Sequence, residues 1–262
     1  MENDLFVREL SHVPEEILKI AGDAQLRDFS CSKRFQTYFV DSGCGLFLKT
    51  GPKGKLLEQA ELVRYFSEKG FTAPVIKYVS TEADFLLMAR VSGESGIHPS
   101  ALAEPDKLCG VLGESLRRLH DTKASGCPIA GVTSKMIAPA KQRYLSGNYD
   151  AWMLEYVDIS DAKAGYELLC ANETALDEST HIHGDACLPN IMLNKDFSFS
   201  GFIDFEGGGM GDRHFDLLWA VWSLSFNLKT NAYKDRFLDA YGRDAFDLER
   251  FKLCGILQAL TY

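Results

Sequence analysis

Residues 183–190 read HGDACLPN, and residues 202–204 read FID. The first segment holds a carboxylate, Asp185, and an amide, Asn190, in the spacing D-x4-N, and the second ends a hydrophobic strand on Asp204. Carboxylate and amide oxygens are the hard donors that Mg²⁺ prefers. The ordered set, with HG in front and ID behind, is the pattern that phosphoryl transfer requires.

The chemistry assigns a role to each of these polar residues. Asp185 would orient and deprotonate an attacking hydroxyl group, while Asn190 and Asp204 would hold magnesium against the phosphates of a nucleotide. A lysine on an early strand should neutralise those phosphates. Lys49 meets this requirement because it ends the strand-like segment LFLK.

A glutamate on the helix after this strand should orient Lys49, and two candidates compete. If Glu58 faces the sheet, Leu62 and Tyr65 face it as well, which suits an apolar inner face. If Glu61 faces the sheet, two further charged residues come with it, which suits solvent. We therefore predict that Glu58 is the partner of Lys49.

The hydrophobic pattern changes character near residue 93. Before it, β-rich segments surround one helix, which predicts a small antiparallel sheet with a crossing helix. These segments cover residues 35–40, 46–49, 75–79 and 84–91. We predict an α+β, bilobal architecture with an N-terminal nucleotide-binding lobe over 1–88, a hinge over 89–93 and a larger, mainly helical C-terminal lobe over 94–262.

Helical periodicity dominates the second part. Four leucines recur at spacings of 4, 4 and 3, at positions 108, 112, 116 and 119, and predict one amphipathic helix. Asp212 precedes another apolar stripe, and its carboxylate is suited to cap the first turn of a helix.

Composition bounds the class of protein. The 262 residues carry 28 basic and 37 acidic side chains, a net charge of −9, and 46% are hydrophobic, which is ordinary for a globular chain. The acidic balance argues against a nucleic-acid partner and suits a cationic small molecule. We expect no membrane partner, because the longest apolar-rich run is too short to span a bilayer.

Cysteine and histidine usage point to a reducing compartment and to no structural metal. Seven cysteines without a C-x-x-C pair predict free thiols and a cytoplasmic protein, and the acidic N-terminus MEND precedes no signal-like apolar region. His181 and His183 form an H-x-H motif, but with no third ligand nearby we favour two ordinary histidines at a strand end.

Five segments together resemble the aminoglycoside 3′-phosphotransferases, within the protein-kinase-like fold. They are HGDACLPNIML at 183–193, FSGFID at 199–204, GDRHFD at 211–216, LRRLH at 116–120 and LFLK at 46–49. The resemblance implies a bilobal kinase fold, the cofactors ATP and Mg²⁺, and transfer of the γ-phosphoryl group to the 3′-hydroxyl of an aminoglycoside, which confers resistance.

The resemblance also implies site residues. Asp185 is implied as the catalytic base, Asn190 and Asp204 as the magnesium ligands, and Lys49 as the group that holds the phosphates. Contacts to the adenine and to the phosphate-facing loop are implied for Phe47, which would stack near the base, for the Ala89 to Val91 backbone, and for Ser30 or Ser32, of which we select Ser32.

The acceptor side departs from the resembled family. Acidic candidates for binding the ammonium groups are Asp150, Glu155, Asp158 and Asp161, and Tyr262 is expected to stack on a sugar ring. The C-terminal segment LQALTY lacks the acidic pair of the family, and Phe226 stands where a charge is expected. We therefore expect that kanamycin-type acceptors are phosphorylated, but that they bind more weakly, or over a narrower range of compounds, than in a family member that retains both acidic clusters.

Two other functions remain open at this stage. One is a kinase of the same fold that acts on another hydroxylated metabolite, such as an amino alcohol or amino sugar. The other is a nucleotide-binding pseudokinase, against which the intact set Lys49, Asp185, Asn190 and Asp204 argues, because a protein without catalysis has no chemical need for all four.

Overall fold

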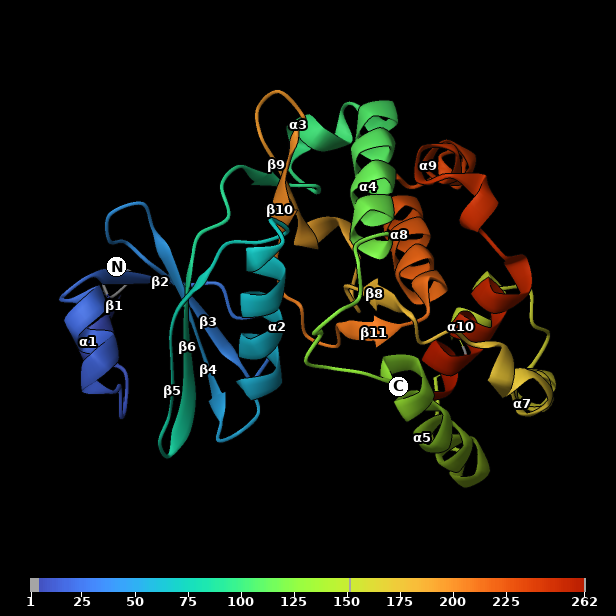
Figure 1. Cartoon of the computed structure of the whole chain (residues 1–262), viewed down its shortest axis with the longest axis horizontal. Coiled ribbons are helices and arrows are strands. Elements are labelled where there is room, and N and C mark those ends of the chain that lie inside the picture. Colours follow the sequence, from blue (N-terminus) through green and yellow to red (C-terminus); the bar gives the residue numbers. More distant parts are fainter. Residues whose placement is uncertain (1–4, 151, 262) are drawn as a thin grey trace. The chain divides into compact units, whose positions relative to one another are not determined.

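The computed structural model describes residues 5–150 and 152–261 and divides the chain into two compact units (Figure 1). Unit 1 comprises residues 1–92 with 200–203, and unit 2 comprises residues 93–199 with 204–262. Unit 1 is an antiparallel sheet with helices, and unit 2 is mainly helical, as the predicted α+β class requires.

Unit 1 is built on a six-stranded sheet of order β1-β2-β3-β4-β6-β5, in which each neighbouring pair is antiparallel. The strands are β1 (Leu5–Phe6), β2 (Gln25–Asp28), β3 (Gln36–Val40), β4 (Leu46–Pro52), β5 (Val75–Ser80) and β6 (Ala83–Ala89). The helices are η1 (Val7–Glu9), α1 (Glu15–Ala21) and α2 (Leu57–Glu68).

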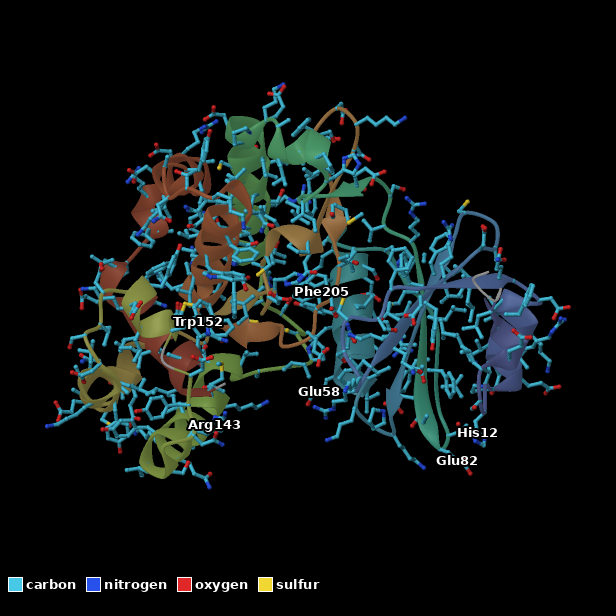
Figure 2. The ribbon with its side chains drawn as sticks, turned by 180° about the vertical axis from the view of Figure 1, so that it is seen from behind. His12, Glu58, Glu82, Arg143, Trp152 and Phe205 are labelled. Atoms are coloured by element: carbon cyan, nitrogen blue, oxygen red, sulfur yellow. The ribbon has the colours of Figure 1, made fainter. Side chains whose placement is uncertain are left out.

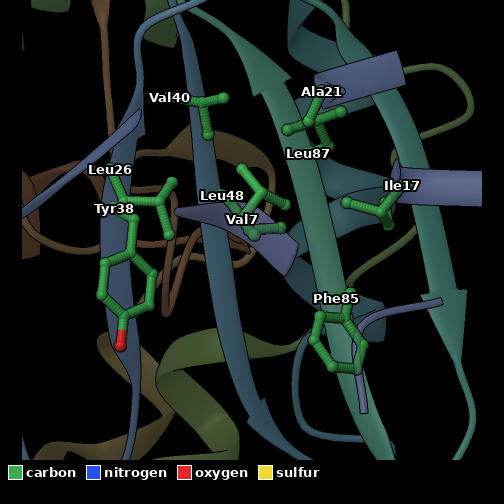
Figure 3. Packing of buried hydrophobic residues seen from close by; sticks show 9 residues of the cluster. All are labelled: Val7, Ile17, Ala21, Leu26, Tyr38, Val40, Leu48, Phe85 and Leu87. Carbon is green, nitrogen blue, oxygen red and sulfur yellow. The ribbon is translucent and has the colours of Figure 1, made fainter. Parts of the chain in front are cut away.

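The two faces of this sheet are covered by different helices. Leu48, Phe85 and Leu87 pack with Ile17 of α1 in one buried cluster, which Figure 3 shows from close by. Leu86, between Phe85 and Leu87 on β6, points to the opposite face and packs with residues that include Ala60 of α2. The hydrophobic pattern predicts α2 but not α1, so the helix that covers the second face of the sheet is seen only in the structure.

Unit 2 contains most of the helices. They are α3 (Pro99–Leu102), α4 (Pro105–His120), α5 (Val132–Ser146), α6 (Trp152–Tyr156), α7 (Ala162–Asn172), η2 (Glu173–Ala175), η3 (Leu188–Asn190), α8 (Arg213–Leu228), α9 (Lys234–Tyr241), η4 (Arg243–Ala245) and α10 (Leu248–Thr261). The remaining strands are β7 (Glu94–Ser95), β8 (Thr180–Ile182), β9 (Ile191–Leu193), β10 (Phe199–Phe202), of which residues 200–202 belong to unit 1, and β11 (Gly209–Gly211). They form a sheet of order β10-β9-β7 and a β11-β8 ribbon.

Two sequence predictions about unit 2 are confirmed. The leucines at 108, 112, 116 and 119 lie on α4 and are all fully buried, and α4 packs against α9. Asp212 caps α8, where its carboxylate accepts a hydrogen bond from the His214 backbone N–H. In the part of the chain that the structure describes, no helix has the length and apolar character needed to cross a membrane.

Candidate active site

Within unit 2, the β8–β11 ribbon brings the loop of Asp185 and the loop that begins at Asp204 together. Gly209 of β11 pairs with Ile182 of β8 in antiparallel register, so the loop that follows β8 and the loop that precedes β11 leave the ribbon together. A Cβ atom at Gly184 would lie 2.3 Å from the carbonyl of Gly207. Only a glycine permits this approach, which brings the Asp185 loop against the loop that begins at Asp204.

A buried carboxylate holds the backbone just before Asp185. Asp216, on α8, is fully buried and accepts hydrogen bonds from the backbone N–H groups of His183 at 2.6 Å and Gly184 at 2.8 Å. Its carboxylate also lies 3.0 Å from Nε2 of His120, on α4. Charge-assisted bonds of this kind are stronger than neutral ones, so α8 and α4 together fix the position of the loop.

Asp185 itself is half-buried, and Asn190 orients its carboxylate. Nδ2 of Asn190 donates to Oδ2 of Asp185 and to its backbone carbonyl, each at 2.9 Å. The Asp185 N–H lies 3.2 Å from Nδ1 of His183. The spacing D-x4-N places these two side chains in contact, because the one-turn helix η3 folds Asn190 back onto Asp185.

Asp204 is exposed and has a left-handed backbone, with φ of 61°. The next residue, Phe205, is buried, and its ring lies 4.5 Å from that of His183, between centroids. A non-glycine residue with positive φ is uncommon and often marks a functional site. The packing of Phe205 on His183 holds the Asp204 backbone beside the Asp185 loop.

The donor set on these two loops fits a magnesium ion. Asn190 uses its amide nitrogen on Asp185, so the group that it can offer a metal is its amide oxygen, and Asp204 offers a carboxylate. Both are hard oxygen donors, and Mg²⁺ is held in nucleotide sites by one or two such groups together with phosphates and water.

The H-x-H motif has structural contacts. Nδ1 of His181 lies 3.1 Å from the backbone carbonyl of Thr122, and His183 packs against Phe205. Within residues 5–150 and 152–261, no group of three or more His, Cys, Asp or Glu side chains is arranged to hold a metal ion. The two histidines therefore support the loop that follows β8.

In unit 1, Lys49 lies on the face of the sheet that α2 covers. It pairs across the sheet with Leu86, which belongs to the cluster packed against α2, and Lys49 is only 6% exposed. Its Nζ lies 5.3 Å from the centroid of the Phe35 ring. Phe47 stands two residues earlier on the same face and packs edge-on against Phe39, with centroids 5.4 Å apart.

The register of α2 differs from the expectation for Glu58. This residue, labelled in Figure 2, lies in the first turn of α2 and is exposed, whereas Glu61 is half-buried. The buried polar side chain of α2 is Gln59, which is 5% exposed and neighbours Ala60 of the sheet-facing cluster. The assumption that Glu58 faces the sheet is wrong, because Leu56 and Ala60 set the packed stripe. The pairing of Glu58 with Lys49 stays a prediction.

Gln59 is a residue that the sequence analysis missed. The choice between Glu58 and Glu61 passes over Gln59, because its amide side chain carries no charge that could pair with a lysine. Its signal was available in the spacing, since Gln59, Val63 and Phe66 recur at intervals of four and three and are all buried.

The other residues expected near the nucleotide have local contacts as well. The Ala89 N–H donates to the Pro74 carbonyl at 3.0 Å, so a contact from the segment Ala89 to Val91 to a nucleotide would use other backbone groups. Val91 is buried. Oγ of Ser32 accepts from the Phe35 N–H at 3.0 Å and the Arg34 N–H at 3.2 Å, and so shapes the turn between β2 and β3.

The acidic residues expected to bind the acceptor lie around α6. The Asp150 carboxylate accepts from the Trp152 N–H at 3.2 Å, just before the helix. Glu155 is exposed on α6, and Asp158 is exposed just after it with φ of 57°. Tyr262, the expected sugar-stacking residue, lies outside the described residues.

Comparison with known proteins shows the family of this chain. The model of the phosphotransferase enzyme family (APH) matches residues 27–254. A protein of Lactococcus lactis described as "Probable aminoglycoside 3'-phosphotransferase" is 36% identical over 243 residues, which is 92% of each chain. An aminoglycoside 3′-phosphotransferase of Niallia circulans is 28% identical and covers 91% of this chain and 94% of its own.

A solved structure has the same fold. It is the aminoglycoside phosphotransferase APH(3'')-Id from Streptomyces rimosus, with a TM-score of 0.75, 21% identity and coverage of 94% of this chain and 96% of its own. The same protein has been solved in complex with ADP and streptomycin, with a TM-score of 0.72 against this chain. The Asp185 loop with its supports and these matches over most of the length lead to one conclusion: the chain belongs to the phosphotransferase enzyme family.

Proposed function

We propose that this chain is an aminoglycoside 3′-phosphotransferase, which transfers the γ-phosphoryl group of ATP to a sugar hydroxyl group of an aminoglycoside. The arrangement around Asp185 carries the proposal: Asn190 holds its carboxylate, and Asp216 holds the backbone before it. The description of the relative from L. lactis supports this acceptor, and the ADP complex of the structural relative supports ATP as the phosphoryl donor.

In the proposed reaction, the acceptor hydroxyl oxygen forms a bond to the γ-phosphorus atom. The bond from this phosphorus to the β–γ bridging oxygen breaks, and ADP leaves. The hydroxyl proton passes to the Asp185 carboxylate, which the Asn190 amide keeps oriented. A positioned base contributes about 10²–10⁴-fold to the rate, so most of the remaining acceleration comes from positioning and from charge on the phosphates.

The other roles follow from residue chemistry. Lys49 would bind the phosphates and Phe47 would stack near the adenine. Asn190 and Asp204 would hold Mg²⁺, which supplies charge neutralisation on the phosphates when it is bound. The cysteine usage supports a cytoplasmic location.

The test is ADP release by the purified chain with kanamycin A, streptomycin and choline as acceptors, with the phosphorylated position located by NMR. We expect phosphorylation of kanamycin A at the 3′-hydroxyl. Asp185→Asn should lower kcat at least ~10²-fold with the Kd for ATP nearly unchanged, because the proton acceptor is lost. The matched control is Asp196→Asn, an exposed aspartate on the β9–β10 turn whose removal should leave kcat unchanged.

A kinase of small amino alcohols is the second candidate. A site for a polycation gains from several carboxylates, and the acceptor side of this chain has few of them. Turnover of choline with none on kanamycin A would replace the first proposal by this one. ATP binding without turnover of any acceptor in a wider panel would favour a protein that only binds nucleotide.

A further inference from the structure

A groove of about 560 Å³ lies on unit 2, between α4 and the turn that joins β9 to β10; Figure 1 labels these elements. Four residues of α4 that line it recur at intervals of four, three and four: Lys107, Val111, Glu114 and Arg118. Residues at these intervals share one face of a helix. This face differs from the buried leucine stripe of α4, and none of its side chains has a role in the proposed phosphoryl transfer.

Two cationic side chains of this face are held over aromatic rings of the hairpin. Nζ of Lys107 lies 5.5 Å from the centroid of the Phe197 ring, and the guanidinium carbon of Arg118 lies 4.9 Å from that of Phe199. Lys107 also pairs with Glu104 at 3.2 Å, an exposed contact that a ligand carboxylate can replace. The two cations are 11 positions apart on α4, which corresponds to about 16 Å along the helix. The groove thus offers two positive charges at a set separation.

Ser115 places a hydroxyl group in the groove, between these cations along α4. The residue lines the groove and is only 4% exposed. Within residues 5–150 and 152–261, its hydroxyl group makes no hydrogen bond. Buried hydroxyl groups in proteins are nearly always paired, because an unpaired one loses its bonds to water. A ligand in the groove would supply the missing partner.

The backbone of Phe197 is a second sign that the groove has a function. Its φ is 66°, in the left-handed region that favours glycine, and a bulky residue there is an outlier. The main chain itself closes the turn, since the Phe197 N–H donates to the Asn194 carbonyl at 2.9 Å. The ring is not needed for this bond, and it adds the contact with Lys107 in the groove. Strain that is retained in this way is typical of functional sites.

Glu114 limits the class of ligand. Its side chain is exposed on the same face of α4, between the two cations along the helix. A polyphosphate or a nucleic acid carries charge at every unit and would meet this carboxylate, and the net charge of −9 disfavours a nucleic acid further. A peptide with two separate acidic side chains avoids this repulsion. An extended chain advances about 3.3 Å per residue, so acidic residues four or five positions apart span about 13–16 Å, which matches the separation of the cations.

We propose that this groove binds an extended segment of a partner protein, with two acidic residues four or five positions apart and an apolar residue between them. Lys107 and Arg118 would bind the two carboxylates, and Val111 would contact the apolar side chain. The Ser115 hydroxyl would pair with the backbone of the segment. This interaction goes beyond the proposed function, because it requires neither ATP nor an acceptor.

The test measures the fluorescence anisotropy of labelled alanine-based peptides that carry one leucine between two aspartates. The two aspartates are placed two, four, five or seven positions apart. We expect the lowest Kd at four or five positions and a Kd at least ~5-fold higher at two or seven, because only one aspartate then reaches a cation. Replacing both aspartates by asparagine should abolish binding, and added salt should weaken it.

Charge reversal in the groove should act on the same peptides. Lys107→Glu and Arg118→Glu should each raise the Kd of the best peptide about 5-fold, because one exposed charge pair is lost and a repulsion is gained. The double variant should bind a peptide with lysines in place of the aspartates more tightly than the parent chain does. Lys163→Glu is the matched control, because Lys163 is an exposed lysine of α7 outside the groove.

Two further variants separate binding from folding. Phe197→Gly removes the ring, and glycine adopts the left-handed backbone without strain, so the circular dichroism spectrum should be unchanged while the Kd rises. Ser115→Ala should raise the Kd about 3-fold, since the hydroxyl group that pairs with the peptide is lost.

Three outcomes would overturn the proposal. They are a Kd that is the same at every aspartate spacing, a Kd unchanged in both charge-reversal variants, and no binding of any peptide at about 1 mM. An oligothymidylate bound as tightly as the best peptide would assign the groove to nucleic acid and overturn the proposal as well. ADP release with kanamycin A tests the proposed function separately, and Lys107→Glu should leave it unchanged. A parent chain that releases no ADP would contradict the proposed transfer without altering the peptide result.

Discussion

Asp216 shows how one side chain positions a reacting group that it does not touch. Its two oxygens accept the N–H groups of His183 and Gly184, and Nε2 of His120 lies 3.0 Å from the same carboxylate. A carboxylate has acceptor capacity on both oxygens, which is why it can accept two backbone N–H groups while it also lies against His120. The backbone that leads into Asp185 is therefore held in place by a side chain of α8.

Asp216→Asn should lower kcat on kanamycin A by about 10–100-fold, the size of effect expected when a positioning contact is lost near a reaction centre. The reason is that an amide NH₂ would face one of the backbone N–H groups, leaving buried donors without an acceptor. Steady-state kinetics should show kcat falling with the KM for ATP nearly unchanged. Asp239→Asn, which alters an exposed ion pair with Arg243, serves as the control. Equal kcat values for the variant and the parent chain would contradict the positioning role.

At the scale of an element, α8 begins at a residue that does more than cap it. Asp212 accepts from the His214 N–H at the first turn, and its other oxygen accepts the Asp177 N–H and Nε of Arg250, each at 2.9 Å. Burial would raise the pKa of Asp212, but the bonds and charge of His214 and the bond from Asp177 hold it below the ordinary value. The helix start is thereby connected to α10 and to the segment before β8.

Asp212→Ala should lower the free energy of unfolding by about 3–5 kcal/mol, because it leaves the Arg250 charge and several donors partly buried without their partner. Asp161 is the matched control, since it caps α7 through the Ala164 N–H but is exposed. Asp161→Ala should lower the free energy of unfolding much less than Asp212→Ala, because water can take the place of the exposed cap. Urea denaturation followed by circular dichroism measures both. Similar losses for the two variants would show that Asp212 acts as a cap alone.

At the scale of the whole molecule, His120 links three helices of unit 2. Its Nε2 lies near Asp216 of α8, and its Nδ1 lies 2.7 Å from the hydroxyl of Tyr241, on α9. Burial lowers the pKa of His120 below its ordinary value of 6.5, although the bond to Asp216 and the charges of Asp216 and Asp121 oppose this shift and the charge of Arg213 adds to it. The imidazole is therefore neutral in the folded chain at neutral pH.

The stability of the chain should consequently fall in mild acid. Below about pH 6.5 the unfolded chain takes up a proton on this histidine and the folded chain does not, so stability present above pH 6.5 is lost as the pH falls, by at most about 1.4 kcal/mol per pH unit for one group. Urea denaturation between pH 7.5 and 5.5 measures this slope. It should be shallower in His120→Gln and unchanged in His12→Gln, because His12 is exposed. Equal slopes in all three proteins would contradict the assignment.

Several features follow from local sequence alone. The leucine stripe of α4, the Asp212 cap and the D-x4-N loop depend on residues at most a few turns apart, so spacing and side-chain chemistry predict them. The same is true of β4, which carries both Phe47 and Lys49. Side chains alternate between the two faces of a strand, so these two residues lie on one face. The fold class follows from these elements and their order along the chain.

Other features of the fold and of the candidate site were decided by the tertiary structure alone, because these features depend on contacts between segments that are distant in the sequence. Glu58 and Gln59 are adjacent, and only the packing of α2 on the sheet determines that Gln59 is buried and Glu58 exposed. The Asp216 contacts to the Asp185 loop and the meeting of Trp152 with Trp222 join residues more than 30 positions apart. Spacing in the sequence describes one element at a time, whereas these contacts arise when separate elements bury their faces against one another.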